Sequence, residues 1–596
     1  MQVDDAMEKK SQKKILFVSH KEQQCGVYQF GRNIAEVLVK SCKYTFVYAE
    51  CSSEEEFCLR VADVKPAAII YNHYYTATMP WLTQKVVQKI KVPNIGIIHE
   101  VNQVIADNLD DVFFDFHIAP DPTLLLKNPL VFKTGRLVFE YVNNYAVPDV
   151  VTIGSFGFGT AGKGFEKLIA TVQNEFDEAI IKLHIPFATF GDADGTAAQD
   201  IAKKCKELIV KTNIKLQLSH NFLNQKELLD FLAGNSLNVF FYDENKGRGI
   251  SSVIDHALAV ERPVAITKSN MFRHIVSGNP SICIENSSLK QILKNGFAPL
   301  ARYRRDWNAA NLLWDYERII DGVLGRKLRT RSVMEIVKRK MNKVFKIIDN
   351  KAFKDSWIPE LDQEAVEEQI VKDDSYIPVS TSNETVFNRI LDNAARHQYQ
   401  PVIKVLHKLL PVMISRKIPE ANIQQAFVLD TVHKMAVQLE SPSILCIGSY
   451  DDTAASALKK YGYCIDEVDP VINYDLNVFI QKPSTVKGNY DIIFLTSVIE
   501  HVRDDELFIK QIAALLAPGG TAIITCDYND QYKPGDHIPQ EDFRLYTQKD
   551  FKQRFLPLIP DCELVDQPEW DCPNPDFFYA GCWYTFATFV FRKKKP

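Results

Sequence analysis

Residues 444–462 read ILCIGSYDDTAASALKKYG, and this stretch decides the fold of the last third of the chain. Its first four residues are apolar and predict a buried strand, Gly448 permits a sharp turn, and an alanine-rich helix follows. The next segment, YCIDEVDP at 463–470, predicts a second strand that ends in acid. Strands that alternate with helices predict a parallel sheet, with a ligand site beyond the carboxyl ends of its strands.

Three later segments continue the pattern at the expected spacing. They are NYDIIFLTSVIEHV at 489–502, LLAPGGTAIITCDY at 515–528 and FRLYTQKDF at 543–551. In this order the motifs resemble those of class I S-adenosylmethionine-dependent methyltransferases, over residues 440–596. The resemblance implies a third Rossmann-like domain and S-adenosylmethionine as cofactor.

The resemblance also implies a set of cofactor-binding residues. Gly448 and Ser449 form the first turn, where Gly448 faces the methionine part of the cofactor. Asp469 holds the ribose hydroxyls. Ser497 and Glu500 lie beside the reaction centre.

Methyl transfer to a hydroxyl needs a base within hydrogen-bond reach of the departing proton. His501 is the first candidate by residue type and place, with the alternative that it is only a wall of the site. Asp527 is the second candidate, at the end of the following strand. Some relatives bind a metal through an E-x-x-E-H pattern, but Ser497 stands at its first position, so no metal is expected. The aromatic loop residues Trp570, Phe577, Phe578 and Tyr579 are candidates for a wall that stacks on a sugar ring.

The first half of the chain contains two more series of strands and helices. One begins with KKILFVSH at 13–20 and the other with VVTIGSFGF at 150–158. Two successive Rossmann-like domains and a returning helix predict a cleft that brings a donor and an acceptor together. Gly26 and Lys163 lie where a first strand meets its helix, a place suited to phosphate.

A third segment of this half, GRGISSVIDHALAV at 247–260, places Gly249, Ser251 and Ser252 before a helix that contains Asp255. Backbone N–H groups and hydroxyls suit a pyrophosphate, and a carboxylate suits a ribose, although Ser-Ser is also an ordinary N-cap. Together the segments resemble GT-B-fold glycosyltransferases, in particular the large retaining group, over residues 15–345. The resemblance implies a nucleotide-sugar donor.

The same resemblance brings further residues into the predicted site. Lys163 matches the phosphate-binding lysine of the family, and His99 matches a histidine near the donor sugar, which makes it a catalytic candidate. Asp255 stands where the family has the second glutamate of an E-x7-E motif. The chain departs from that motif, because Gly247 stands near the position of the first glutamate, and Gly157 replaces a common arginine.

These patterns predict an α/β fold of two Rossmann-like GT-B domains followed by a third, class I methyltransferase domain. The expected divisions are a disordered tail (1–14), the acceptor-side domain (15–149), the nucleotide-sugar domain (150–346), a linker (347–384), a helical lead-in (385–440) and the methyltransferase domain (441–596). Residues 325–346 contain nine Lys or Arg and one Glu. They are either the crossing helix of the transferase fold or a peripheral membrane contact.

Composition narrows the function classes. The chain has 596 residues and a net charge of −5, whereas a domain built to hold nucleic acid is usually basic. Its 12 cysteines form no C-x-x-C pair, which argues against structural zinc and for reduced thiols in a cytoplasmic protein. Neither a signal peptide nor an apolar run of about 18 residues occurs in the sequence.

The economical hypothesis is one enzyme with two activities on one glycan. The first half adds a sugar to a glycan or lipid-linked saccharide acceptor, and the second half methylates a sugar hydroxyl, as in enzymes of surface-polysaccharide or virion-glycan assembly. In the main alternative only the methyltransferase is active, and the first half is a glycan-binding scaffold. A nucleic-acid methyltransferase and a purely structural protein are further alternatives. Donor sugar, nucleotide, methylated position and retention or inversion stay open.

Overall fold

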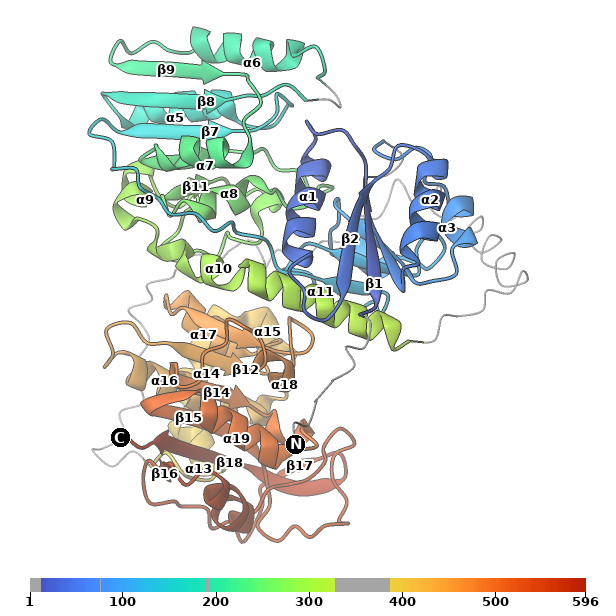
Figure 1. Cartoon of the computed structure of the whole chain (residues 1–596). Helices are drawn as coiled ribbons and strands as arrows, with labels where there is room; N and C mark the ends of the chain where they lie inside the picture. The colour runs from blue at the N-terminus through green and yellow to red at the C-terminus, as the bar shows by residue number, and fades with distance from the viewer. Residues whose placement is uncertain (1–11, 75–76, 189–191, 327–385) are drawn as a thin grey trace, which may run out of the picture. The chain divides into compact units, whose positions relative to one another are not determined.

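The computed structural model describes residues 12–74, 77–188, 192–326 and 386–596 (Figure 1). By contacts the chain forms two compact units. The amino-terminal unit comprises Met1–Leu124 and Asn128–Glu368, and the carboxy-terminal unit takes the rest. The predicted linker at 347–384, and all but the first two residues of the basic segment 325–346, lie outside the described residues.

The first sheet of the amino-terminal unit is entirely parallel, with the order β2-β1-β3-β4-β5-β6. Its strands are β1 (Lys14–Ser19), β2 (Thr45–Glu50), β3 (Ala68–His73), β4 (Asn94–Ile98), β5 (Phe116–Ala119) and β6 (Val131–Lys133). The helices between them are α1 (Gly26–Leu38), α2 (Glu54–Val64), α3 (Gln84–Lys89) and α4 (Gln103–Asn108). The strands are nearly continuous apolar runs, as expected of a sheet that is covered on both faces.

The second sheet is also entirely parallel, with the order β11-β10-β7-β8-β9. Its strands are β7 (Thr152–Phe156), β8 (Ala179–His184), β9 (Ile214–Ser219), β10 (Leu237–Phe240) and β11 (Val264–Ile266). The helices are α5 (Phe165–Glu175), α6 (Thr196–Glu207), α7 (Gln225–Ala233), α8 (Val253–Ala259), α9 (Leu289–Asn295) and α10 (Ala301–Asp306). In both sheets the strand order reverses next to the first strand of the series, which is the doubly wound arrangement.

One helix connects the two sheets of this unit. After α10 the chain returns in α11 (Ala309–Leu324), which runs along the first sheet beside α1 (Figure 1). Leu312, Tyr316 and Ile320 of α11 are buried with Ile15 and Phe17 of β1. The crossing helix of the predicted fold is therefore α11, which ends before the basic segment that we considered for this role.

The carboxy-terminal unit has one mixed sheet with the order β13-β12-β14-β15-β18-β16, and β17 pairs with β18. Its strands are β12 (Ile444–Ile447), β13 (Ile465–Val468), β14 (Tyr490–Thr496), β15 (Leu516–Tyr528), β16 (Cys562–Leu564), β17 (Phe577–Tyr579) and β18 (Cys582–Lys593). The first four in this order are parallel, and β16, β17 and β18 are antiparallel to their neighbours. The aromatic residues near the carboxyl end of the chain therefore lie mostly in β17 and β18.

Helices cover both faces of this sheet. They are α13 (Asn393–Gln398), α14 (Gln400–Leu409), α15 (Pro411–Ser415), α16 (Asn422–Ala436), α17 (Thr453–Lys460), α18 (Leu476–Phe479) and α19 (Asp505–Leu515). The predicted lead-in is part of this unit, because Phe427 and Leu429 of α16 share a core with Ile444 and Phe494. The Pro-Gly-Gly segment (518–520) lies within β15, beside a register shift against β14.

Candidate functional sites

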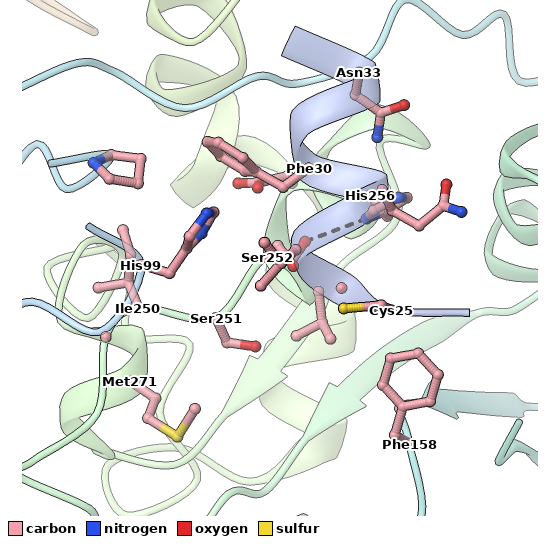
Figure 2. Close-up of a pocket in the computed structure, with 18 of the residues that line it drawn as sticks. Cys25, Phe30, Asn33, His99, Phe158, Ile250, Ser251, Ser252, His256 and Met271 are labelled. Carbon is pink, nitrogen blue, oxygen red and sulfur yellow. Dashed lines mark hydrogen bonds between the residues drawn. The ribbon is translucent and has the colours of Figure 1, made fainter. Parts of the chain in front are cut away.

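A cavity of about 480 Å³ lies between the two sheets of the amino-terminal unit. Figure 2 shows Phe30 and Asn33 of α1 and His99, which follows β4, around the same space as Ser251 and Ser252 before α8. All seven residues that the sequence predicts for the donor site line this cavity: Gly26, His99, Lys163, Gly249, Ser251, Ser252 and Asp255. They come from both domains, so the fold brings together segments that are far apart in the sequence.

Lys163 places a cation inside the cavity. Its Nζ lies 3.9 Å from the centre of the Tyr242 ring, a cation–π contact. The next residue, Gly164, has φ +68°, and a Cβ there would lie 1.9 Å from the carbonyl oxygen of Phe241. Only glycine therefore allows the close turn that places Lys163 at the cavity.

His99 is neutral and its tautomer is fixed by its neighbours. Burial lowers the pKa of His99 to about 3. Asn72 donates its Nδ2 to Ser19 Oγ and to the carbonyl of Val27, so its Oδ1 must accept from His99 Nε2, at 2.8 Å. His99 Nδ1 is then a hydrogen-bond acceptor, which suits a sugar hydroxyl.

Asp255 forms a buried ion pair that the sequence does not reveal. Arg136 donates from Nε and Nη2 to the two carboxylate oxygens of Asp255, and from Nη1 to the carbonyl of Pro120. Both side chains of the pair are almost fully buried. Burial raises the pKa of Asp255, although the arginine acts in the opposite direction. The carboxylate predicted for a ribose is thus already bound by a guanidinium.

Three further contacts join the two domains of this unit. Gly249 donates its N–H to Glu100 Oε2 at 2.6 Å, and Arg248 Nε lies 3.3 Å from Glu100 Oε1. Arg273 pairs with the buried Asp121. The sequence prediction missed Glu100, although it directly follows His99 in GIIHEVNQ. Its partner lies 149 positions away, so no local pattern points to the contact.

A second cavity, of about 770 Å³, lies at the carboxyl ends of β12, β13 and β14 in the carboxy-terminal unit. Four of the predicted residues line it: Gly448, Asp469, Ser497 and His501. Gly448 has φ +74°, and a Cβ there would lie 2.3 Å from Val498 Cγ2. Asp469 accepts hydrogen bonds from the backbone N–H groups of Tyr450 and Val471. Ser449, Glu500 and Asp527 are buried outside the lining.

The lining of this cavity offers two free hydrogen-bond acceptors to a polar ligand. Asn422 Oδ1 and Gln424 Oε1 are buried without a hydrogen-bond partner, although both side chains line the cavity. Such atoms are satisfied when a polar ligand binds. Both residues lie on α16, and the sequence prediction missed them. The available signal was the polar NIQQ directly before the apolar run AFVL at 426–429.

His501 is held as a cation. Its Nδ1 lies 3.1 Å from Asp542 Oδ1, and this contact raises the pKa of His501 to about 9. A protonated imidazole has no lone pair with which to accept a proton. The geometry thus favours an electrostatic role for His501 over the predicted role as base.

The predicted aromatic wall is only partly available. Trp570 and Phe577 are buried in the core, and Trp570 donates its Nε1 to the carbonyl of Thr588. For these two residues the prediction was wrong. Phe578 and Tyr579 are about half exposed.

Two findings concern the described parts of the chain only. None of the helices in those ranges combines the length and hydrophobicity that a bilayer crossing needs. Nor do the described His, Cys, Asp and Glu side chains form a group of three or more arranged for a metal ion.

Comparison with known proteins found similarities for both parts of the chain. Residues 421–556 match a family model described as a methyltransferase domain. The first half is similar to HepE from Anabaena with UDP-glucose, at 14% identity and a TM-score of 0.37 over 52% of this chain and 99% of that one. It is also similar to an α-glucosyltransferase with UDP, at 13% identity and a TM-score of 0.35 over 52% of this chain and all of that one.

A third similar structure is the trehalose-6-phosphate protein from E. coli bound with UDP-2-fluoro glucose, at 10% identity and a TM-score of 0.37 over 53% of this chain and all of the other. The fold assignment itself follows from the two parallel sheets, the cavity between them and the returning helix. The chain therefore has an amino-terminal unit with the GT-B architecture, and its carboxy-terminal unit contains a methyltransferase domain.

Proposed function

We propose that the chain is a bifunctional glycan-modifying enzyme. The amino-terminal unit transfers a sugar from a nucleotide-sugar donor to a glycan or lipid-linked saccharide acceptor. The carboxy-terminal unit methylates a sugar hydroxyl. One observation carries the first activity: seven residues predicted from separate segments line one cavity between the two sheets.

In the amino-terminal unit, Lys163 binds the phosphates of the donor, since it is a cation in a partly apolar cavity. His99 accepts a hydrogen bond from a donor sugar hydroxyl through Nδ1. Gly26, Ser251 and Ser252 contribute N–H and hydroxyl groups around the same space. Glu100 completes the polar wall on the side of the first domain.

In the carboxy-terminal unit, S-adenosylmethionine supplies the methyl group. Asp469 binds the ribose, Gly448 allows the close approach of the ligand, and Gln424 and Asn422 bind its polar edge. His501 lies at the wall of the same cavity and fixes its electrostatics as an imidazolium.

A scaffold role for the amino-terminal unit is the second candidate. It is favoured by the Arg136–Asp255 pair, which occupies the expected ribose carboxylate, and by Gly247, which provides no side chain at the expected glutamate. In this case the cleft binds a glycan, and methyl transfer is the only reaction.

Thermal unfolding of the full-length chain with UDP, GDP, ADP and TDP distinguishes the two candidates. A ligand at 100 times its dissociation constant adds about 2.7 kcal/mol of stability, which shifts a melting transition by several degrees. A shift with one nucleotide supports sugar transfer and names the donor class. If no nucleotide shifts the transition while a glycan does, the scaffold candidate replaces it.

A further inference from the structure

The cavity of the amino-terminal unit contains a cation whose charge its own wall does not compensate. Arg136 lines this cavity, but its charge is compensated by Asp255. Arg248, another lining residue, pairs with Glu100. Lys163 lines the same cavity, and among the described residues no carboxylate pairs with it. Its charge is therefore available to an anionic ligand.

Tyr242 contributes an unused hydrogen-bond donor at the same place. It is the second residue after β10, and it lines the cavity although it is only 2% exposed. Its hydroxyl has no hydrogen-bond partner within the described part of the chain. A buried hydroxyl without a partner costs free energy, which is recovered when a polar ligand binds. Because Lys163 Nζ lies 3.9 Å from the centre of the Tyr242 ring, both donors can reach neighbouring oxygens of one ligand.

Gly157 leaves room for a ligand atom beside these two groups. It directly follows β7 and lines the cavity. A Cβ at this position would have the hydroxyl oxygen of Tyr242 as its nearest neighbour, at 3.4 Å, and Cδ of Lys163 at 3.9 Å. These are ordinary contact distances, so an atom fits there without displacing its neighbours. The hydroxyl therefore borders a space that a ligand can enter.

We propose that the Tyr242 hydroxyl donates a hydrogen bond to the diphosphate of the nucleotide-sugar donor, beside the phosphate oxygen that Lys163 binds. A diphosphate has anionic oxygens on two adjacent phosphorus atoms, so it can accept from two donors that lie close together. Tyr242 thus adds a neutral donor to the charge of the lysine. This inference rests on the proposed sugar transfer and deepens it, because it names the part of the donor that Tyr242 recognises.

The charge of Lys163 favours the diphosphate over the other parts of a nucleotide sugar. The base, the ribose and an ordinary sugar are neutral, so the diphosphate gains most from an uncompensated cation. Phe156 and Phe158, on either side of Gly157 in the chain, also line the cavity. Apolar surroundings of this kind strengthen a hydrogen bond to an anion.

Isothermal titration calorimetry of the full-length Tyr242→Phe variant tests the proposal. The probes are UDP, GDP, ADP and TDP and the corresponding nucleosides, with S-adenosylhomocysteine present so that adenine compounds do not bind the second cavity. Phenylalanine keeps the ring beside Lys163 and removes only the hydroxyl. We expect the affinity for the diphosphate that binds the unchanged chain to fall about tenfold, since a hydrogen bond to a charged group is lost. The affinity for its nucleoside should stay constant.

Thermal unfolding without nucleotide gives a second readout and a matched control. Because Tyr242→Phe removes an unpartnered buried hydroxyl, it should raise the melting temperature of the amino-terminal unit. Tyr316 of α11 is also fully buried with an unpartnered hydroxyl, but it lies in the core and outside the cavity lining. Tyr316→Phe should therefore stabilise the unit in the same way and leave the affinity for the diphosphate unchanged.

The other outcomes contradict the inference in distinguishable ways. Equal affinity of the diphosphate for Tyr242→Phe and the unchanged chain would mean that the hydroxyl does not reach the phosphates, and sugar transfer would stand. Equal losses for the diphosphate and the nucleoside would assign Tyr242 to the shape of the whole cavity. A lower melting temperature, or failure to fold, would show a structural role for the hydroxyl. If none of the four diphosphates binds the unchanged chain, the proposed sugar transfer fails together with the inference.

Discussion

At the scale of single residues, the buried Arg136–Asp255 pair has a clear consequence for stability. Its guanidinium and carboxylate are both almost fully buried, and the charge of each compensates that of the other. Removal of one partner leaves an uncompensated buried charge, which costs about 3–5 kcal/mol. Replacement of both partners by apolar residues of similar volume removes that charge altogether.

We therefore predict that Arg136→Met lowers the melting temperature of the amino-terminal unit by several degrees. The double variant Arg136→Met/Asp255→Leu should recover most of the loss. Differential scanning calorimetry of the full-length chain measures both. Equal losses in the single and double variants would contradict the idea that the pair neutralises a buried charge.

The His501–Asp542 pair predicts a dependence of stability on pH. The pKa of His501 is about 9 in the folded chain, above its ordinary value of 6.5, mainly because of Asp542. A raised pKa contributes stability that is fully present below about pH 6.5 and is lost as the pH rises through about 9.

The Asp542→Asn substitution removes the largest cause of the raised pKa of His501. We expect the melting temperature of the carboxy-terminal unit to fall less steeply between pH 6.5 and 9 than in the unchanged chain. Thermal melts at intervals of half a pH unit check the slopes. Parallel curves for the two proteins would show that the pair does not link stability to pH.

At the scale of elements, the loop before α8 depends on a close approach to the chain after β4. A Cβ at Gly249 would lie 2.1 Å from the carbonyl oxygen of His99, whereas a Cβ at Gly247 would meet nothing nearer than 3.7 Å. Gly249→Ala must therefore push the two domains apart at the cavity, and Gly247→Ala need not.

We expect Gly249→Ala to weaken nucleotide binding at least tenfold and to lower the melting temperature of the unit, since overpacking costs about 1–3 kcal/mol. Gly247→Ala, two residues earlier, should change the stability by less than about 0.5 kcal/mol. Titration with the nucleotide that stabilises the unchanged chain gives the affinities. Similar affinities in the two variants would mean that the contact with His99 does not shape the site.

The same loop shows how far the sequence could predict the site. Residues that directly follow parallel strands, such as His99 and Gly448, were predictable, because all such strands end at one edge of a sheet. Glycine and serine before α8 were predictable for a similar reason. Pairs of side chains that are far apart in the sequence were not predictable. Arg136 and Asp255 are 119 positions apart. His501 is charged because of Asp542, and no motif connects these two residues.

At the scale of the whole molecule, the two cavities belong to two different compact units. Each ligand should therefore stabilise one unit. We predict that S-adenosylhomocysteine raises the melting transition of the carboxy-terminal unit by several degrees and leaves the other transition within a degree.

A nucleotide that binds the first cavity should raise the melting transition of the amino-terminal unit and leave that of the carboxy-terminal unit unchanged. Calorimetric scans of the full-length chain with each ligand and with both check this, and the two shifts should add. A shift of both transitions by either ligand would instead show that the sites are energetically coupled.

The return of α11 to the first sheet has a consequence for synthesis of the chain. The first domain to leave the ribosome is completed only after the second domain of its unit, because the helix that covers β1 is encoded some 300 residues after it. At translation rates of about 5–20 residues per second, the apolar surface that receives Leu312, Tyr316 and Ile320 stays uncovered for about 15–60 seconds. A nascent chain that stalls in this interval exposes a hydrophobic surface to which chaperones bind. A gene truncated after the first sheet encodes a fragment that keeps this surface exposed and is prone to aggregation.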